Sequence, residues 1–217
     1  MESITTRAPI DAPDLPGHGS AAAARMRLPE TAELLAKEFG PGAYVGYSMG
    51  GRVALHLALA HPHLVSHLVL CSTTAGIDNP DERAARRASD QSLAAHLRTV
   101  GLETFLMEWT AQPMFASLTR SRHDDEVRLA NTAEGLASSL ELAGTGEQDP
   151  LWDRLHILNM PVLVVTGAND AKFTEIGHRL VDAIGDNARH ISFPDTGHAV
   201  PFERSADFAA LVTAFLR

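Results

Sequence analysis

The sequence predicts an α/β fold with a mostly parallel sheet flanked by helices. Four short apolar runs are separated by stretches of helical periodicity, at 43–46, 68–70, 162–166 and, more weakly, 190–193. Such alternation makes each helix a crossover between parallel strands. The last stretch repeats apolar residues at three- and four-residue spacing, which predicts a helix covering one sheet face, through Phe208, Leu211, Val212 and Phe215.

Length and composition predict one domain. The 217 residues, 45% of them hydrophobic, suffice for a single domain over 1–217 and leave no room for a second. A net charge of −9 argues against nucleic acid or a membrane as partner, because a negative field repels phosphate. Residues 1–7 hold no apolar leader and no run could cross a bilayer, so we expect a cytoplasmic location. The single cysteine, Cys71, excludes an internal disulfide and is expected to be a small buried hydrophobe.

Residues 75–150 break the alternation and predict an inserted helical cap. Three helices are expected there, at about 80–99, 102–109 and 124–142. Asp78 or Asn79 would cap the first, and the turn at 144–146 would end the third. Such a cap would lie over the carboxyl ends of the strands, where open parallel sheets bind ligands.

The strongest local motif is Gly46-Tyr47-Ser48-Met49-Gly50, which follows an expected strand and opens an expected helix. A serine at this sharp turn is held in a strained backbone with its hydroxyl exposed, and the glycines on either side let strand and helix pack closely. The helix start points the Met49 N–H at a developing oxyanion. A glycine-rich turn without chemistry is the alternative.

Two later residues favour chemistry at this turn. A serine hydroxyl becomes reactive when a histidine accepts its proton, and a carboxylate holds that histidine in the right tautomer. Asp170 and His198 each stand just beyond one of the last two apolar runs. The chain order Ser48, Asp170, His198 is that of an α/β-hydrolase-fold triad. Taken singly, Asp170 could form an Asx turn and His198 could be an exposed loop histidine. Asp195 and Glu175 are lesser candidates for the acid.

Four histidines close in sequence raise the question of a metal site: His56, His61, His63 and His67. Only His63 and His67 stand four residues apart, and no carboxylate lies among the four. We therefore expect no metal, and the sequence indicates no organic cofactor.

Arg52 stands four residues beyond Ser48, one helical turn along the same side. From there a guanidinium could reach a ligand carboxylate bidentately, or it could simply lie on a solvated face. Arg128 lies on the third expected cap helix, with no indication of whether it joins a pocket. Trp109, at helical spacing, could be ordinary cap core.

Three arginines cluster on the first expected cap helix: Arg83, Arg86 and Arg87. For Arg83 and Arg87 we expect solvated faces paired with Glu82 or Asp81. For Arg86, a solvated face and a ligand-binding role remain equally open.

These residues resemble one family of the α/β-hydrolase superfamily, the 2-succinyl-6-hydroxy-2,4-cyclohexadiene-1-carboxylate synthases of menaquinone biosynthesis. The similarity runs from about Pro13 to the C-terminus and rests on 46–52, 82–87, Trp109, 112–115, Asn131, 144–146 and 170–173. The resemblance implies roles for seven residues: Ser48, Asp170 and His198 as triad, Arg52 and Arg86 on substrate carboxylates, and Tyr47 and Trp109 lining the pocket.

The resemblance also implies a reaction other than ester hydrolysis. In the family, serine and histidine remove a ring proton, and pyruvate is eliminated from a multiply carboxylated cyclohexene substrate, as in a carbon–oxygen lyase. A small anionic substrate fits the arginines of an otherwise acidic chain.

The sequence departs from the family in two places. The run 14–19 resembles the loop after the family's fourth strand, yet only thirteen residues precede it, so the N-terminal strands and their His-Gly loop are expected to be missing. In this fold that loop supplies the second oxyanion N–H. Losing one such donor costs on the order of 10² to 10³ in rate. The second departure is Pro201-Phe202, where the family often has another histidine.

Three functions therefore stay open at this point. The first is the pyruvate-eliminating synthase. The second is a serine hydrolase of small esters or carbon–carbon bonds, which needs the triad but no paired arginines. The third is a truncated, non-catalytic protein of the same fold. The sequence does not predict an oligomeric state.

Overall fold

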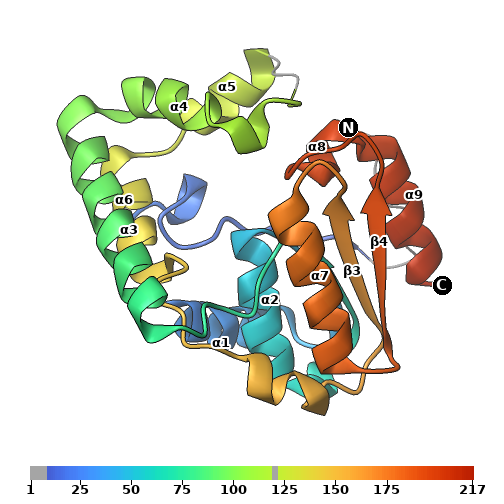
Figure 1. Ribbon diagram of the computed structural model, residues 1–217. Helices are drawn as coiled ribbons and strands as arrows, with labels where there is room; N and C mark the ends of the chain where they lie inside the picture. The colour runs from blue at the N-terminus through green and yellow to red at the C-terminus, as the bar shows by residue number, and fades with distance from the viewer. Residues whose placement is uncertain (1–8, 119–121) are drawn as a thin grey trace.

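The fold is a parallel sheet between two layers of helices, described in a computed structural model for residues 9–118 and 122–217 (Figure 1). The prediction about residues 1–7 lies outside these ranges. In the described chain the sheet has four parallel strands in sequential order: β1 (Gly42–Tyr47), β2 (Val65–Cys71), β3 (Val162–Gly167) and β4 (Ala188–Phe193). All four apolar runs predicted as strands are confirmed.

Nine α-helices are found in the described residues: α1 (Leu28–Phe39), α2 (Met49–Ala60), α3 (Pro80–Val100), α4 (Leu102–Thr110), α5 (Arg122–Leu129), α6 (Ala133–Ala143), α7 (Ala171–Ile184), α8 (Val200–Glu203) and α9 (Ser205–Phe215). Short 3-10 helices occur at η1 (Gly19–Ala21), η2 (Pro62–Leu64), η3 (Pro113–Phe115) and η4 (Trp152–Ile157). Across residues 9–118 and 122–217, no helix combines the length and apolar character needed to span a membrane.

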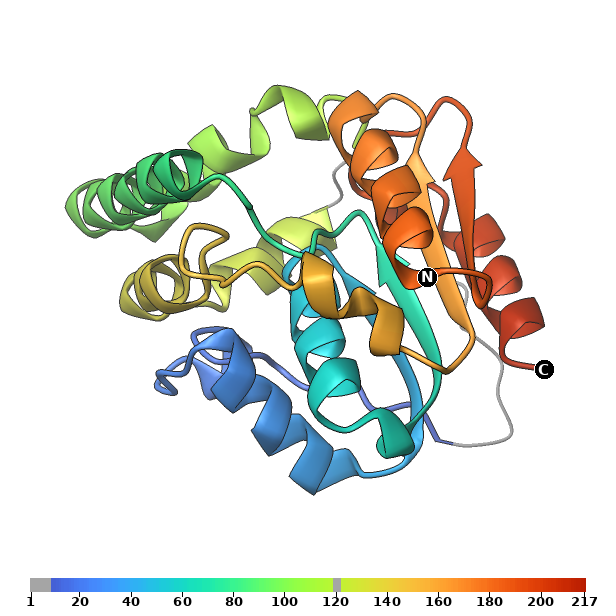
Figure 2. The ribbon, with the colours of Figure 1, turned by 60° about the horizontal axis from the view of Figure 1, so that its bottom comes forward.

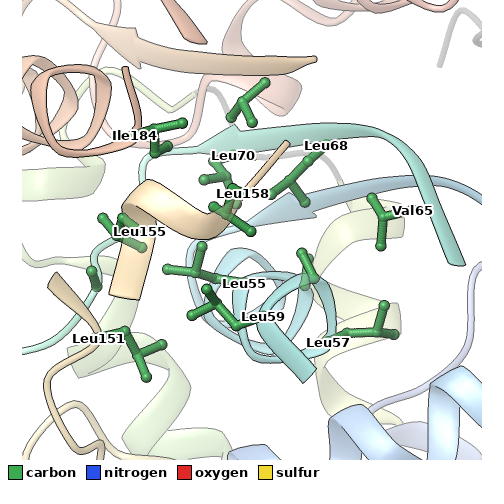
Figure 3. Close-up of a cluster of buried hydrophobic side chains, with 14 of the residues drawn as sticks. Leu55, Leu57, Leu59, Val65, Leu68, Leu70, Leu151, Leu155, Leu158 and Ile184 are labelled. Atoms are coloured by element: carbon green, nitrogen blue, oxygen red, sulfur yellow. The ribbon is translucent and has the colours of Figure 1, made fainter. Parts of the chain in front are cut away.

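The larger core lies between the sheet and α2, α7 and η4. Figure 3 shows its leucines interlocking: Leu55 and Leu59 from α2, Leu155 and Leu158 around η4, and Leu68 and Leu70 from β2. β3 is buried along its whole length, as expected for a strand covered by helices on both faces. This packing fixes the carboxyl ends of the strands relative to one another.

The opposite face is covered by α9 (Figures 1 and 2). Phe208 and Val212 of α9 pack against Val69 and Val165 of the sheet, as the helical spacing predicted. Cys71 is fully buried in this cluster, and burial raises the pKa of its thiol to about 12. The expectation that Cys71 is a small buried residue is confirmed.

Helices α3 to α6 form an arm that reaches over the carboxyl ends of the strands (Figures 1 and 2). Asn79 caps α3 by accepting hydrogen bonds from the N–H groups of Asp81 and Glu82. The first two cap helices begin and end close to the predicted bounds.

The prediction of one continuous helix at 124–142 was wrong. The chain forms α5 and α6, separated at Asn131 and Thr132. Thr132 caps α6 through the N–H of Gly135, and the Asn131 amide donates back to the Arg128 carbonyl. Asn131 also accepts from the N–H of Gly19, far away in sequence. Because these side-chain bonds compete with helix continuation, the helix breaks here.

Candidate active site

Ser48 occupies the sharp turn between β1 and α2. Its backbone has φ 50° and ψ −111°, a conformation that a non-glycine residue holds only when its surroundings enforce it. The Ser48 N–H donates to the Cys71 carbonyl at 2.9 Å, and its carbonyl accepts from the Thr73 hydroxyl at 2.8 Å. The turn is therefore anchored to the neighbouring strand β2.

Two glycines, Gly46 and Gly51, permit this turn. Of these two, only Gly46 belongs to the motif that was singled out from the sequence. A Cβ on Gly46 would collide with the Gly50 carbonyl, and one on Gly51 would lie 2.7 Å from the Thr73 Cβ. A Cβ on Gly50 would meet nothing within 4 Å. The expectation that Gly50 is needed for close packing was wrong, because it is the next residue of α2, Gly51, that faces Thr73 just beyond β2.

The structure brings Ser48, His198 and Asp170 into one hydrogen-bonded line. His198 Nε2 lies 3.3 Å from Ser48 Oγ, and His198 Nδ1 lies 2.7 Å from Asp170 Oδ2. Asp170 also caps α7, because its Oδ1 accepts from the Phe173 N–H at 3.3 Å. The Asx-type turn offered as an alternative for Asp170 is therefore present alongside the contact with His198.

The loops that carry Asp170 and His198 are bonded directly to each other. The N–H of Ala168 donates to the Phe193 carbonyl at 2.8 Å, and that of Asn169 to the Thr196 carbonyl at 2.9 Å. A Cβ on Gly167 would fall on the carbonyl oxygens of Gly197 and Thr196. Only a glycine lets the two loops approach this closely.

His198 is enclosed by aromatic rings and is 2% exposed, so it is not the exposed loop histidine of the alternative. Phe173 lies edge-on at 4.5 Å between ring centroids, Tyr47 at 5.5 Å and Phe115 at 6.3 Å. Burial raises the pKa of the Tyr47 phenol well above its ordinary range, so the ring stays neutral. The imidazole thus works in a site with little water.

Trp109 stacks on Phe105 at 5.8 Å and lies 6.3 Å from Phe115, which in turn contacts His198. It belongs to the edge of the cap's own apolar cluster. The cap-core interpretation of Trp109 therefore holds, and Phe115 links it to the site.

Met49 is the first residue of α2, so its backbone N–H has no partner within the helix. The positive end of the helix dipole lies at the same point, beside Ser48. The Met49 side chain turns away toward the cap, where its sulfur accepts from the Ser139 hydroxyl at 3.5 Å. The N–H thus lies at the start of α2, next to Ser48.

Arg52 lies inside the molecule, at 7% exposure, where α2 meets the end of the cap. Its Nη1 donates to the Ala143 carbonyl at 2.7 Å. Burial, and then the nearby charge of Arg86, lower the pKa of Arg52 to about 10, so it stays charged at neutral pH. The carboxylate of Asp90 also lies close to Arg52 and offsets part of this lowering.

Arg86 is held by a buried carboxylate. Its Nε donates at 2.8 Å to Asp90, which is 3% exposed and also accepts from the Gly146 N–H at 3.4 Å. Because this bond is made through Nε, the Nη1 and Nη2 groups of the guanidinium remain able to bind a second carboxylate. The two arginines singled out from the sequence thus share one polar cluster at the cap–core junction.

Arg128, which the sequence left open, lies near Tyr47. Burial raises the pKa of Tyr47, and the charge of Arg128 offsets part of that rise. Its Nη1 is buried and finds no hydrogen-bond partner within the described chain, and Asp125 Oδ1 lies 3.6 Å away, beyond hydrogen-bond range.

The pairing predicted for Arg83 and Arg87 was wrong. Arg87 pairs with Glu147 at 2.6 Å and donates to the Gly146 carbonyl, and Arg83 donates to the carbonyl of Ile77. Arg87 finds its partners in the 144–147 turn, which folds back onto α3, and Arg83 finds its partner in the segment just before α3.

The four clustered histidines do not gather at one point. His61 contacts Glu33 at 2.9 Å and lies edge-on to His63, with 6.1 Å between ring centroids. His67 lies edge-on to Phe215, and His56 is partly buried near Arg52. Over residues 9–118 and 122–217, no three His, Cys, Asp or Glu side chains gather as metal ligands would.

Comparison with known proteins places this geometry in a family. The alpha/beta hydrolase family matches residues 6–211. Proteins named 2-succinyl-6-hydroxy-2,4-cyclohexadiene-1-carboxylate synthase are 30% identical in Photorhabdus laumondii and 32% identical in Enterobacter, each over 94% of this chain and over 74% and 80% of the relative. The chain spans 64% of the length of a Bacillus subtilis relative that is 38% identical over 177 residues.

Solved structures of other proteins show the same similarity. The structure of MenH from S. aureus superposes with a TM-score of 0.85 at 30% identity, over 94% of this chain and 81% of the other. A malate-bound esterase from Thermogutta terrifontis gives a TM-score of 0.75 at 25% identity, over 94% of this chain and 78% of the other. The chain belongs to the alpha/beta hydrolase family and, within it, to the family of 2-succinyl-6-hydroxy-2,4-cyclohexadiene-1-carboxylate synthases.

Proposed function

We propose that this chain is a synthase of menaquinone biosynthesis that eliminates pyruvate from a small, multiply carboxylated cyclohexene substrate. One observation carries the proposal: the line Ser48, His198, Asp170 begins one helical turn before the buried cation Arg52 on α2, in an acidic protein. The names of the relatives support the same reaction.

The residues divide the work as follows. Asp170 accepts the Nδ1–H of His198, which leaves Nε2 free to accept the Ser48 hydroxyl proton. The serine oxygen then removes the ring proton of the substrate, and the imidazolium that forms is stabilised by Asp170. The Met49 N–H and the start of α2 stabilise negative charge on oxygen.

The arginines bind and orient the substrate. Arg52 and Arg86 meet its carboxylates at the cap–core junction, and Arg128 approaches from α5 beside Tyr47. Tyr47 and Phe115 close the site around His198, with Trp109 behind Phe115. Guanidinium groups suit this role because they bind carboxylates bidentately and stay charged when buried.

Pyruvate release from the relatives' substrate tests the proposal. We expect Ser48→Ala to lower turnover by about 10² to 10⁴, the usual contribution of positioned proton transfer. We expect Arg86→Ala to raise KM by about 10-fold or more, since a hydrogen bond between charged groups is lost. Pyruvate release no greater than that of Ser48→Ala would rule out the synthase.

A serine hydrolase of small esters is the second candidate, favoured by the likeness to the T. terrifontis esterase. It needs the same three side chains but not the arginines. Hydrolysis of an activated ester that Ser48→Ala abolishes and Arg86→Ala leaves intact, without pyruvate release, would support it. Binding of a dicarboxylate with neither activity would support the non-catalytic alternative.

A further inference from the structure

Glu203, the last residue of α8, holds the backbone on both sides of His198. Its Oε2 accepts from the N–H of Gly197 at 2.8 Å, and its Oε1 accepts from the N–H of Ala199 at 3.0 Å. The Glu203 N–H also donates to the Ala199 carbonyl at 2.9 Å, which closes a ring of bonds around the end of the loop. None of these hydrogen bonds is made by the side chain of Ser48, His198 or Asp170.

The position of the imidazole depends on this part of the loop. The first half of the loop is tied down by the bond between the Asn169 N–H and the Thr196 carbonyl. Beyond Thr196, the two N–H groups that flank His198 both end on Glu203. Since a side chain is aimed by the backbone on either side of its Cα, Glu203 fixes where the ring points.

A glutamate is the side chain that fits both bonds. An ionised carboxylate offers two acceptor oxygens, and charge-assisted bonds to N–H groups are stronger than neutral ones. A glutamine offers one oxygen and turns an NH₂ group toward the other N–H. An alanine leaves both N–H groups without this partner.

We propose that Glu203 is a positioning residue that aims His198 at Ser48, an inference that rests on the proposed role of these two residues. A helix cap without such a role would change only the stability of the protein. A positioning role predicts instead that reactivity at Ser48 falls in protein that is still folded.

Covalent labelling of Ser48 by a fluorophosphonate probe tests the inference, with Glu203→Gln and Glu203→Ala compared at a temperature well below their Tm. We expect labelling to slow by about 10-fold in Glu203→Gln and about 100-fold in Glu203→Ala, since small misplacements of a reacting group cost factors of this size. Where pyruvate release is measured, kcat falls and KM stays unchanged.

Glu38→Gln is the matched control, because Glu38 is an exposed glutamate on α1. It should label at the wild-type rate. Glu203→Gln keeps one of the two bonds, so it remains the deciding variant where Glu203→Ala does not fold. Wild-type labelling rates in a folded Glu203→Gln would overturn the inference about Glu203 alone. Absence of labelling in the wild type itself, relative to Ser48→Ala, would overturn the proposed nucleophile and the positioning role together.

Discussion

The loops around Ser48 and the helical cap above them are held together by different kinds of contact. In the loops, backbone meets backbone: Gly46 lets β1 and α2 touch, and Gly167 lets two loops share hydrogen bonds. In the cap, helices pack through an apolar cluster that includes Leu97 and Phe105, and their surfaces are joined by charged pairs, such as Arg98 with Glu134 and Glu141.

The difference has a physical consequence. Where two backbone segments are in close contact, there is no free space for an added methyl group. The methyl group can be accommodated only if a whole loop moves. Exposed ion pairs are weak, screened by salt and easily replaced. The loops should therefore be the rigid part of the site, and the cap the part in which substitutions are tolerated.

Of the substitutions that test this comparison, Gly167→Ala is expected to have the largest effect on the site. The new methyl would overlap the carbonyl oxygens of Gly197 and Thr196, so the loop carrying His198 must move away from Asp170. We expect fluorophosphonate labelling of Ser48 to slow by about 100-fold or more. Overpacking should also lower the free energy of unfolding by about 1–3 kcal/mol, measured by denaturant titration.

Gly42→Ala is the control, because a Cβ there meets nothing within 4 Å. It should leave both the labelling rate and the stability near their wild-type values. A Gly167→Ala protein that labels as fast as Gly42→Ala would mean that the two loops need not touch for Ser48 to react.

The parts of the fold that the sequence predicted are those set by local pattern. Apolar runs marked all four strands because buried parallel strands carry continuous apolar side chains. The Ser48 turn followed from its glycines and from its position between a strand and a helix. Asp170 and His198 followed from chain order, since the ends of parallel strands meet at one edge of the sheet.

The parts that could not be predicted depend on contacts between distant segments. The break between α5 and α6 needs Asn131 to reach Gly19, and that partner lies 112 residues away. Arg87 pairs with Glu147 because the 144–147 turn folds back onto α3. Glu203 looked like any glutamate on a short helix until its carboxylate was seen to bridge Gly197 and Ala199. The division into one domain with a cap stays a prediction.

Substitution of His56, a residue of α2, should have an effect of intermediate size that depends on pH. Burial, and then the charge of Arg52, lower the pKa of His56 to about 4, and its Nε2 has no hydrogen-bond partner within the described residues. Because the folded state resists protonation that the unfolded chain accepts, the protein should lose stability as the pH falls from 6.5 toward 4.

His56→Gln removes this titration. We expect its free energy of unfolding to fall less than that of the wild type over the same acid range, by up to about 3 kcal/mol. Denaturant titrations at several pH values measure the difference. His63→Gln, at an exposed histidine, should keep the wild-type acid sensitivity. Parallel pH profiles for His56→Gln and the wild type would contradict a neutral, partly buried His56.

The smallest effect is expected in the cap, at Arg98. Its guanidinium bridges α3 to α6 through Glu134 at 2.8 Å and Glu141 at 2.5 Å, all on the surface. We expect Arg98→Gln to lower Tm by no more than about 2–4 °C in low salt, and by less in 1 M salt, because exposed pairs are screened. Lys37→Gln removes one charge from an exposed position on α1 and controls for net charge.

The same pair of glutamates gives the effect of Arg98→Gln a pH dependence. Hydrogen bonds from Arg98 lower the pKa of Glu134 and of Glu141 below 4.5, the ordinary value. A carboxylate with a lowered pKa stabilises the fold above its unfolded pKa and loses that contribution as the pH drops through the folded value. The Tm gap between wild type and Arg98→Gln should therefore be full at neutral pH and close below pH 4.5. A large gap that survives both acid and salt would mean that the cap is held as rigidly as the loops beneath it.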